Sequence, residues 1–339
     1  MDEKVTLSPR KKRILQVLVD EYISTATPVS SKSITENYLT DVSSATVRNE
    51  LSALEEMGYV EHLHTSSGRV PSPLGYKLYV NELMQKKHMS RAQLDYLREV
   101  LGEHTDNLEQ VVKRAVKVIS EMTDYTSVAM TNLDPEDKIE AVKLLKIKEG
   151  SALLLIVTEE RLLKDNIISL PAGITDESVE AAGKMLSRML EGKRLNETAG
   201  LDEQVAEEFG AYREVFGSVL EAIKKYCKKE SEVVLEGEEK ILAQPEYFDV
   251  EKMRNFLTVV ADKDNLARVL KDSDGGIEVS LKIGAEAGIS EDCSVVTATY
   301  TAGGVNLGTY GVIGPMRMDY KRVITVLESV GRVLEELLK

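Results

Sequence analysis

The chain of 339 residues contains no tryptophan, four phenylalanines and two cysteines. The cysteines, Cys227 and Cys293, lie far apart, which excludes a disulfide framework and a metal site built on paired cysteines. No apolar run approaches the roughly 18 residues of a membrane span, and the first residues contain no apolar signal region. We therefore expect a cytoplasmic protein whose cores are filled by Leu, Val, Ile and Met.

Residues that would indicate catalysis are also missing. No nucleophile stands in a pattern with a general base. Gly308, Gly311 and Gly314 are three residues apart but fall along a predicted strand, which argues against a nucleotide-binding loop. His62 and His64 share one face of a predicted strand and remain a metal-binding alternative, although no third histidine or cysteine is near them. We therefore predict a protein that is not an enzyme and that has no cofactor and no metal.

Residues 43–58 carry the most informative pattern. Ser43 and Ser44 precede the first apolar position as helix-capping residues, and Gly58 marks the end of the helix. The buried stripe of this predicted helix consists of Val47, Leu51 and Leu54. Its opposite face carries small or hydrogen-bonding side chains, namely Ala45, Thr46, Arg48, Asn49 and Ser52. Asparagine can pair with adenine and arginine with guanine in the major groove, so this face is typical of a helix that reads base edges.

The segments around this helix predict a complete DNA-binding unit. Two shorter helices, Lys11 to Ser24 and Ser31 to Tyr38, come before it. A strand from Tyr59 to His64, a turn at Thr65 to Gly68 and Arg69 at the predicted tip follow as a β-wing that could reach phosphate or the minor groove. This order is that of the winged helix-turn-helix.

Basic and polar side chains of this unit are the candidate DNA contacts. Residues 10–13 place four positive charges at the start of the first helix, where they could meet the DNA backbone. A solvated helix face is the alternative for this run. The full candidate set is Arg10, Lys11, Lys12, Ser31, Lys32, Ser43, Ser44, Ala45, Thr46, Arg48, Asn49, Ser52, His64, Thr65, Ser67 and Arg69.

The distribution of charge agrees with DNA binding by the N-terminal part alone. The formal net charge is −14, whereas a DNA-binding protein usually has a basic surface. Residues 1–88 contain 11 Lys and Arg against 11 Asp and Glu, which leaves 32 and 46 for the rest of the chain. The acidic remainder should be repelled by phosphate, so we expect DNA only at the N-terminal part, with strong salt dependence.

Apolar residues spaced by seven from Leu94 to Met122 predict one long helix after this unit. Val112 and Ile119 widen its stripe, which favours packing on a sheet, with dimer contact along its first half as the alternative.

The remaining chain predicts an α+β body interrupted by a module at residues 138–228. A strand at Ser127–Thr131 precedes this module, which contains an antiparallel meander followed by helices at Asp176–Glu191 and Leu201–Lys229. Its predicted strands are Glu140–Ile147, Ala152–Thr158 and Leu162–Leu170. After it come strands at Val233–Gly237, Ile277–Ile283, Ser294–Thr301 and Val305–Ile313, and helices at Val250–Val260, Lys263–Lys271 and Tyr320–Leu338.

Several blocks resemble the HrcA family of heat-inducible transcription repressors. The resemblance covers essentially the whole chain and is weakest across residues 138–228. Ser31, Ser67 and Lys77 depart from the residues usual in the family. The blocks that carry the resemblance are Leu7–Leu15, Pro28–Lys32, Val42–Leu51, His64–Pro71, Glu291–Tyr300 and Gly311–Tyr320.

The resemblance implies a homodimeric repressor that binds an inverted repeat in double-stranded DNA upstream of chaperone operons and is released on heat stress. It implies a winged-helix domain at 1–88, a GAF-like domain at 89–137 and 229–339, and an inserted dimerisation domain at 138–228. It also implies that a GroEL-type chaperonin modulates activity. We predict that one apolar helix face makes the dimer contact, unless this face only covers its own meander; it consists of Val179, Ala182, Met185, Leu186 and Met189.

Two alternatives from other classes stay open. GAF-like domains often bind small molecules, so a regulator with an effector pocket near Tyr300–Tyr310 is one of them. An enzyme joined to a DNA-binding unit is the other, and it is disfavoured because no catalytic residues are found.

Overall fold

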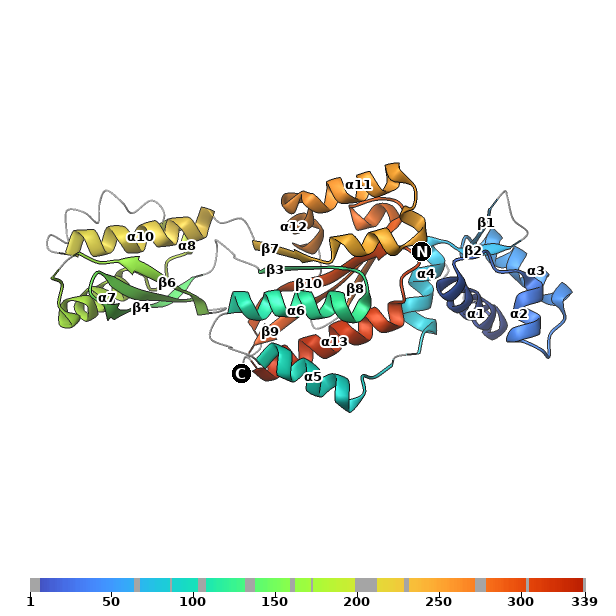
Figure 1. Ribbon diagram of the computed structural model, residues 1–339, viewed down its shortest axis with the longest axis horizontal. Coiled ribbons are helices and arrows are strands. Elements are labelled where there is room, and N and C mark those ends of the chain that lie inside the picture. Colours follow the sequence, from blue (N-terminus) through green and yellow to red (C-terminus); the bar gives the residue numbers. More distant parts are fainter. Residues whose placement is uncertain are drawn as a thin grey trace.

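The computed structural model describes residues 7–63, 68–85, 87–102, 108–131, 138–158, 162–171, 173–198, 212–228, 232–271, 279–302 and 305–337. Three parts follow one another along the longest axis of the molecule (Figure 1). We call residues 7–85 the head, residues 138–228 the insertion, and the remaining described residues the body.

The head has the predicted winged helix-turn-helix order. Its helices are α1 (Pro9–Thr25), α2 (Ser31–Asn37) and α3 (Ser44–Glu56). The side chains of Ser8, Ser30 and Ser43 cap their first turns, which explains where each helix begins. Strands β1 (Val60–His62) and β2 (Arg69–Pro71) form the antiparallel wing, and Val29 adds a short bridge to Arg69.

The recognition helix α3 is positioned by its buried stripe. Val47, Leu51 and Leu54 pack into the head core as predicted. The chain leaves the helix through Gly58, whose φ of +79° favours glycine. Gly68 lets the wing approach the turn before α2, because a Cβ atom there would lie 2.6 Å from the carbonyl carbon of Pro28.

The single long helix predicted from Leu94 to Met122 is wrong. After α4 (Pro73–Leu78) and the π-helical turn η1 (Tyr79–Leu83), the structure has two helices, α5 (Arg91–Gly102) and α6 (Leu108–Thr123). They pack against each other, which two halves of one straight helix could not do. A heptad pattern also fits two amphipathic helices separated by a short break. Gly102 ends the first of them.

The body contains one five-stranded antiparallel sheet with the order β7-β3-β10-β9-β8. Strand β3 precedes residues 138–228 and the other strands of this sheet follow them in the chain. The strands are β3 (Thr126–Thr131), β7 (Glu232–Glu236), β8 (Ser280–Ile283), β9 (Cys293–Ala302) and β10 (Val305–Pro315).

Helices cover both faces of this sheet. Helices α6 and α13 (Tyr320–Leu337) pack on one face, so α6 packs on a sheet as favoured, and α5 packs on α13. The other face is covered by α11 (Val250–Ala261) and α12 (Lys263–Lys271), with the short turns η3 (Glu238–Ala243) and η4 (Pro245–Tyr247) beside them. Adjacent residues of β10 point to opposite faces of the sheet, so Val312 packs in the cluster with α13 and Ile313 in the cluster with α12.

The insertion has its own sheet and its own core. Strands β4 (Ile139–Lys148), β5 (Ser151–Thr158) and β6 (Leu162–Ser169) form the predicted antiparallel meander. Helices α7 (Asp176–Leu190), α8 (Leu195–Thr198) and α10 (Arg213–Lys228) accompany it. The first part of the helix predicted at Leu201–Lys229 lies outside the described residues.

The apolar face of α7 is the point at which the dimer prediction needs correction. Val179, Ala182 and Leu186 are buried against the sheet of their own chain, and Met189 packs beside them. Met185 is 39% exposed. The face therefore covers its own meander, which was the alternative to a dimer contact through this face.

None of the helices within the described ranges is long and apolar enough to cross a membrane.

Candidate nucleic-acid interface

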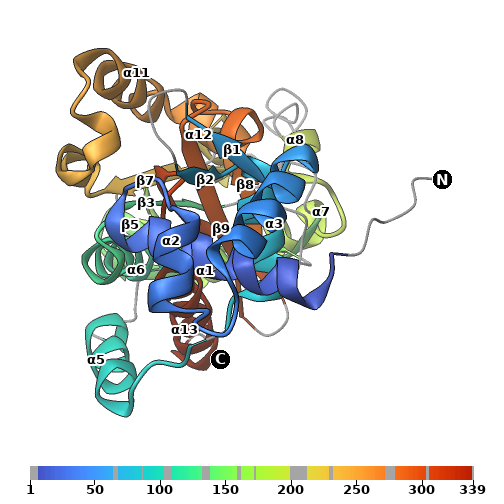
Figure 2. The same cartoon turned by 90° about the vertical axis from the view of Figure 1, so that its right-hand side faces the viewer.

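Helices α2 and α3 and the wing strands enclose a concavity of about 680 Å³ at the far end of the head. Figure 2 looks at the molecule from this end. The lining residues are Ser30, Ser31, Lys32, Ser44, Ala45, Arg48, Asn49, Leu51, His62 and Arg69. Most of them belong to the candidate set, so the fold brings together side chains from three separate segments.

Three side chains of α3 project on the side opposite its buried stripe. Ala45, Arg48 and Asn49 are exposed and lie three and four residues apart, which places them on one helix face. Neither Arg48 nor Asn49 has a side-chain partner within the described part of the chain. An exposed arginine and an exposed asparagine on one helix face can each offer paired hydrogen bonds to a base edge.

Serines hold α2 and α3 at the rim of this concavity. The hydroxyls of Ser31 and Ser44 lie 3.1 Å apart and join the first turns of the two helices. The Ser43 hydroxyl accepts a hydrogen bond from the Thr46 amide at 3.2 Å, so both residues belong to the helix cap. Ser52 is half-buried and does not line the concavity.

The basic run of α1 lies apart from the concavity, and two of its members are paired. Lys11 contacts Glu50 at 2.7 Å, and Lys12 contacts Glu82 at 2.6 Å. Arg10 is exposed at the start of α1. These ion pairs reduce the positive charge that sequence alone assigned to this run.

Arg69 lies in β2 opposite His62 and not at a wing tip. Its Nε and Nη2 atoms both lie 2.8 Å from Oε2 of Glu55, and the arginine side chain is 18% exposed. The pair ties the wing to the end of α3. The sequence carries no signal for this pairing, because Glu55 is 14 residues away from Arg69. His62, which the strand pattern offered only as a metal ligand, lines the concavity.

His64, Thr65 and Ser67 lie outside the described residues. Within the described ranges, no group of three or more His, Cys, Asp or Glu side chains is arranged to hold a metal ion.

The body contains a second, smaller concavity of about 240 Å³ where β9, β10 and α13 meet. Pockets for small molecules usually enclose about 300–1,000 Å³. Within this concavity the Tyr310 hydroxyl already donates to the Leu327 carbonyl at 2.8 Å. This concavity is therefore a weak candidate for an effector site, because it is small and its tyrosine hydroxyl already has a partner.

Comparison with known families gives matches along most of the chain. The model of the HrcA DNA-binding winged helix-turn-helix domain matches residues 6–82. The model of the HrcA protein C-terminal domain matches residues 109–324.

Relatives and a solved structure agree with these matches. The heat-inducible transcription repressor HrcA of Clostridium tetani is 36% identical over 341 residues, covering 98% of this chain and 96% of its own length. That of Acetivibrio thermocellus is 33% identical over 336 residues, with 97% and 96% covered. A crystal structure described as a hypothetical protein superimposes with a TM-score of 0.62 at 23% identity, covers 98% of this chain and 99% of its own, and supports the fold alone. The chain belongs to the HrcA family of heat-inducible transcription repressors.

Proposed function

We propose that the chain represses transcription by binding an inverted-repeat operator as a homodimer, without catalysis of its own. The observation that carries this proposal is the exposed face of α3, where Arg48 and Asn49 stand beside a concavity formed with α2 and the wing. In the proposed complex α3 lies in the major groove, and the wing strands flank it.

The direct test is a footprint on the chaperone promoters of the organism's own genome. Two dimer-related heads should protect two arms of an inverted repeat, because the two-fold axis of the protein must coincide with that of its site. Protection of a single arm, or of none, would contradict the proposal.

The dimer contact that we propose is the outer face of the insertion sheet. Leu145 and Ile147 of β4 are 53% and 54% exposed. Leu153, Leu155 and Val157 of β5 are half-buried on the same side, and Leu153 pairs directly with Leu145. Lys143, which pairs with Leu155, is an exposed charge on this face. The side chains around it are apolar, whereas the outer face of an antiparallel sheet is normally polar, so this face is a candidate for burial on association.

We further propose that a GroEL-type chaperonin helps the repressor to reach its DNA-binding form, and that heat diverts this help to other clients. Strand β3 pairs with β7 and β10, whose residues lie more than 100 positions later in the chain. Contacts of such separation form slowly and leave apolar edges exposed meanwhile. This topology supports a requirement for assisted folding.

Refolding of the unfolded chain with and without chaperonin and ATP tests the proposed requirement for chaperonin. The fraction of protein that binds operator should be higher with chaperonin, with no metabolite added. Equal active fractions in both samples, or activity that appears only with a metabolite, would contradict it and would favour an effector in the GAF-like domain.

A further inference from the structure

The segment Met316–Lys321 lies at the junction of head and body. It connects the end of β10 to the first turn of α13. This segment contributes nothing to the DNA-facing concavity, so its specific side chains need another physical explanation.

Arg317 joins the body to the end of the first head helix. Its Nη1 donates to the Ile23 carbonyl at 2.7 Å, and its Nε donates to Glu246 of the body at 2.5 Å. The arginine side chain is 13% exposed. Ile23 lies in the last turn of α1, where carbonyls lack intrahelical donors and the helix dipole favours a cation. A body residue thus caps a helix of the head.

Lys321 makes a second charged contact one turn earlier on α1. Its Nζ lies 2.6 Å from Oδ1 of Asp20. The Tyr79 hydroxyl donates to the same oxygen. Burial and this hydrogen bond raise the pKa of Tyr79 far above its ordinary value, so the hydroxyl remains a donor under all physiological conditions.

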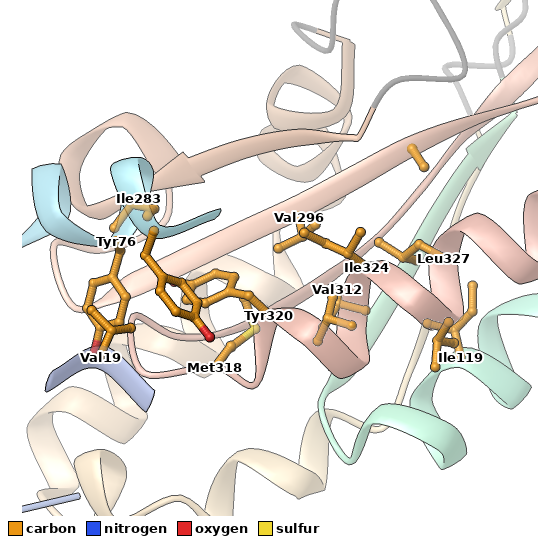
Figure 3. Packing of buried hydrophobic residues seen from close by; sticks show 14 of the residues in the cluster. Val19, Tyr76, Ile119, Ile283, Val296, Val312, Met318, Tyr320, Ile324 and Leu327 are labelled. Atoms are coloured by element: carbon orange, nitrogen blue, oxygen red, sulfur yellow. The ribbon is translucent and has the colours of Figure 1, made fainter. Parts of the chain in front are cut away.

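Apolar packing closes the junction around these charges. Tyr76 of the head and Tyr320 of the body are fully buried, with ring centroids 5.6 Å apart. Figure 3 shows Val19 beside Tyr76 and Met318 beside Tyr320, in one cluster that continues into the body. Lys77 of α4 and Glu286 of the body form an outer ion pair.

The charged contacts and the apolar packing together hold the head against the body in one orientation. Apolar side chains tolerate sliding, whereas an arginine bound to both a helix end and a carboxylate requires one geometry. Because α1 packs directly on α3, an orientation imposed on α1 is imposed on the recognition helix too.

We propose that Arg317 and Lys321 are positioning residues that set the angle of each head relative to the dimer axis, so that both recognition helices meet their half-sites together. The inference rests on the proposed dimeric binding to an inverted repeat. Simultaneous engagement increases affinity through a high effective concentration of the second head, and it is lost when geometry no longer fits.

The test measures affinity for the full inverted repeat and for a single half-site, by fluorescence anisotropy in one buffer. The variants are Arg317→Ala and Lys321→Ala. The matched control is Arg322→Ala, since Arg322 follows directly in α13 and pairs with Asp124 inside the body at 3.1 Å. The unaltered protein should prefer the full operator to a single half-site by about 10²–10⁴-fold, the gain from engaging the second head. Both variants should lose most of this preference while their half-site affinity stays unchanged, and the control should keep both values.

Half-site affinity also reports whether the head is folded. Equal losses of affinity for the half-site and for the full operator would show a merely structural role and would overturn the inference. An unchanged preference for the full operator in both variants would also overturn it. A wild-type protein without any preference for the full operator would instead refute the dimeric binding on which the inference rests.

Discussion

Asn49 and Arg48 carry the proposed sequence reading, because both are exposed on α3 and point away from its buried stripe. Their placement followed from the spacing of Val47, Leu51 and Leu54 alone, since a helix with one apolar stripe must present the intervening residues outward. The partners of charged residues did not follow. Lys11, Lys12 and Arg69 each pair with an acidic residue distant in sequence, and such pairings depend on tertiary structure.

Asn49→Ala should remove base reading. We expect operator affinity to fall by roughly 1–3 kcal/mol and discrimination against altered half-sites to weaken. Titration of operator and altered duplexes at one salt concentration measures both effects. Asn37→Ala is the control, because Asn37 is an exposed asparagine at the end of α2 that does not line the concavity. Unchanged operator affinity in Asn49→Ala would refute the assignment of α3.

Arg69→Ala should weaken binding to every DNA sequence by a similar factor. Arg69 lines the concavity, so we expect its guanidinium to contact phosphate beside its pair with Glu55, and the slope of log affinity against log salt should become shallower by about one in the variant. Binding isotherms on operator and scrambled DNA at several salt concentrations give this slope. An unchanged slope and affinity would show that Arg69 serves only to hold the wing through Glu55.

The winged helix was predictable because local signals agree with tertiary packing along its whole length. Caps at Ser30 and Ser43, the stop at Gly58 and the apolar stripe all indicate the same elements. The α5–α6 hairpin was not predictable, since its periodicity matches that of a longer helix. The sheet face that contacts α7 was equally hidden, because β4 and β5 have apolar residues on both sides.

Gly68→Ala should displace the wing. The added Cβ would lie 2.6 Å from backbone of Pro28, and such overpacking costs about 1–3 kcal/mol of folding free energy. Urea denaturation monitored on the full chain measures the loss, and operator affinity should fall with it. Gly217→Ala is the matched control, because a Cβ there meets no atom within 4 Å and alanine favours its helix. Equal stability of the two variants would contradict the close approach.

The three parts of the molecule follow one another along one axis, with the head at one end, the insertion at the other and the body between them (Figure 1). In the proposed dimer, each head lies at the end of the chain that is opposite the insertion. The two heads can reach their half-sites together only if the dimer contact and the head–body junction are both rigid. The resemblance to a family implied a homodimer and named no contacting surface. The surface that we propose could be chosen only from the coordinates, which show that the predicted α7 face is buried within its own chain.

Leu145→Glu combined with Ile147→Glu should give a monomer. Both side chains are more than half exposed, so folding stability should change little, whereas charge in an apolar contact should prevent association. Light scattering measures the mass, and operator affinity should fall by about 10²–10⁴-fold as the second head is lost. Met185→Glu, on the other side of the insertion, should remain dimeric. A dimer in the double variant would place the interface elsewhere.

The most direct measurement of the central claim compares binding of the full chain to a chaperone-promoter inverted repeat and to a scrambled duplex of equal length and composition. Both isotherms are recorded at physiological salt, with the unaltered protein and with Arg48→Ala/Asn49→Ala. We predict at least a thousandfold preference for the operator, as is usual for specific DNA-binding proteins, and its near-complete loss in the double variant. Equal affinity for both duplexes, or a preference that survives in the double variant, would contradict the account.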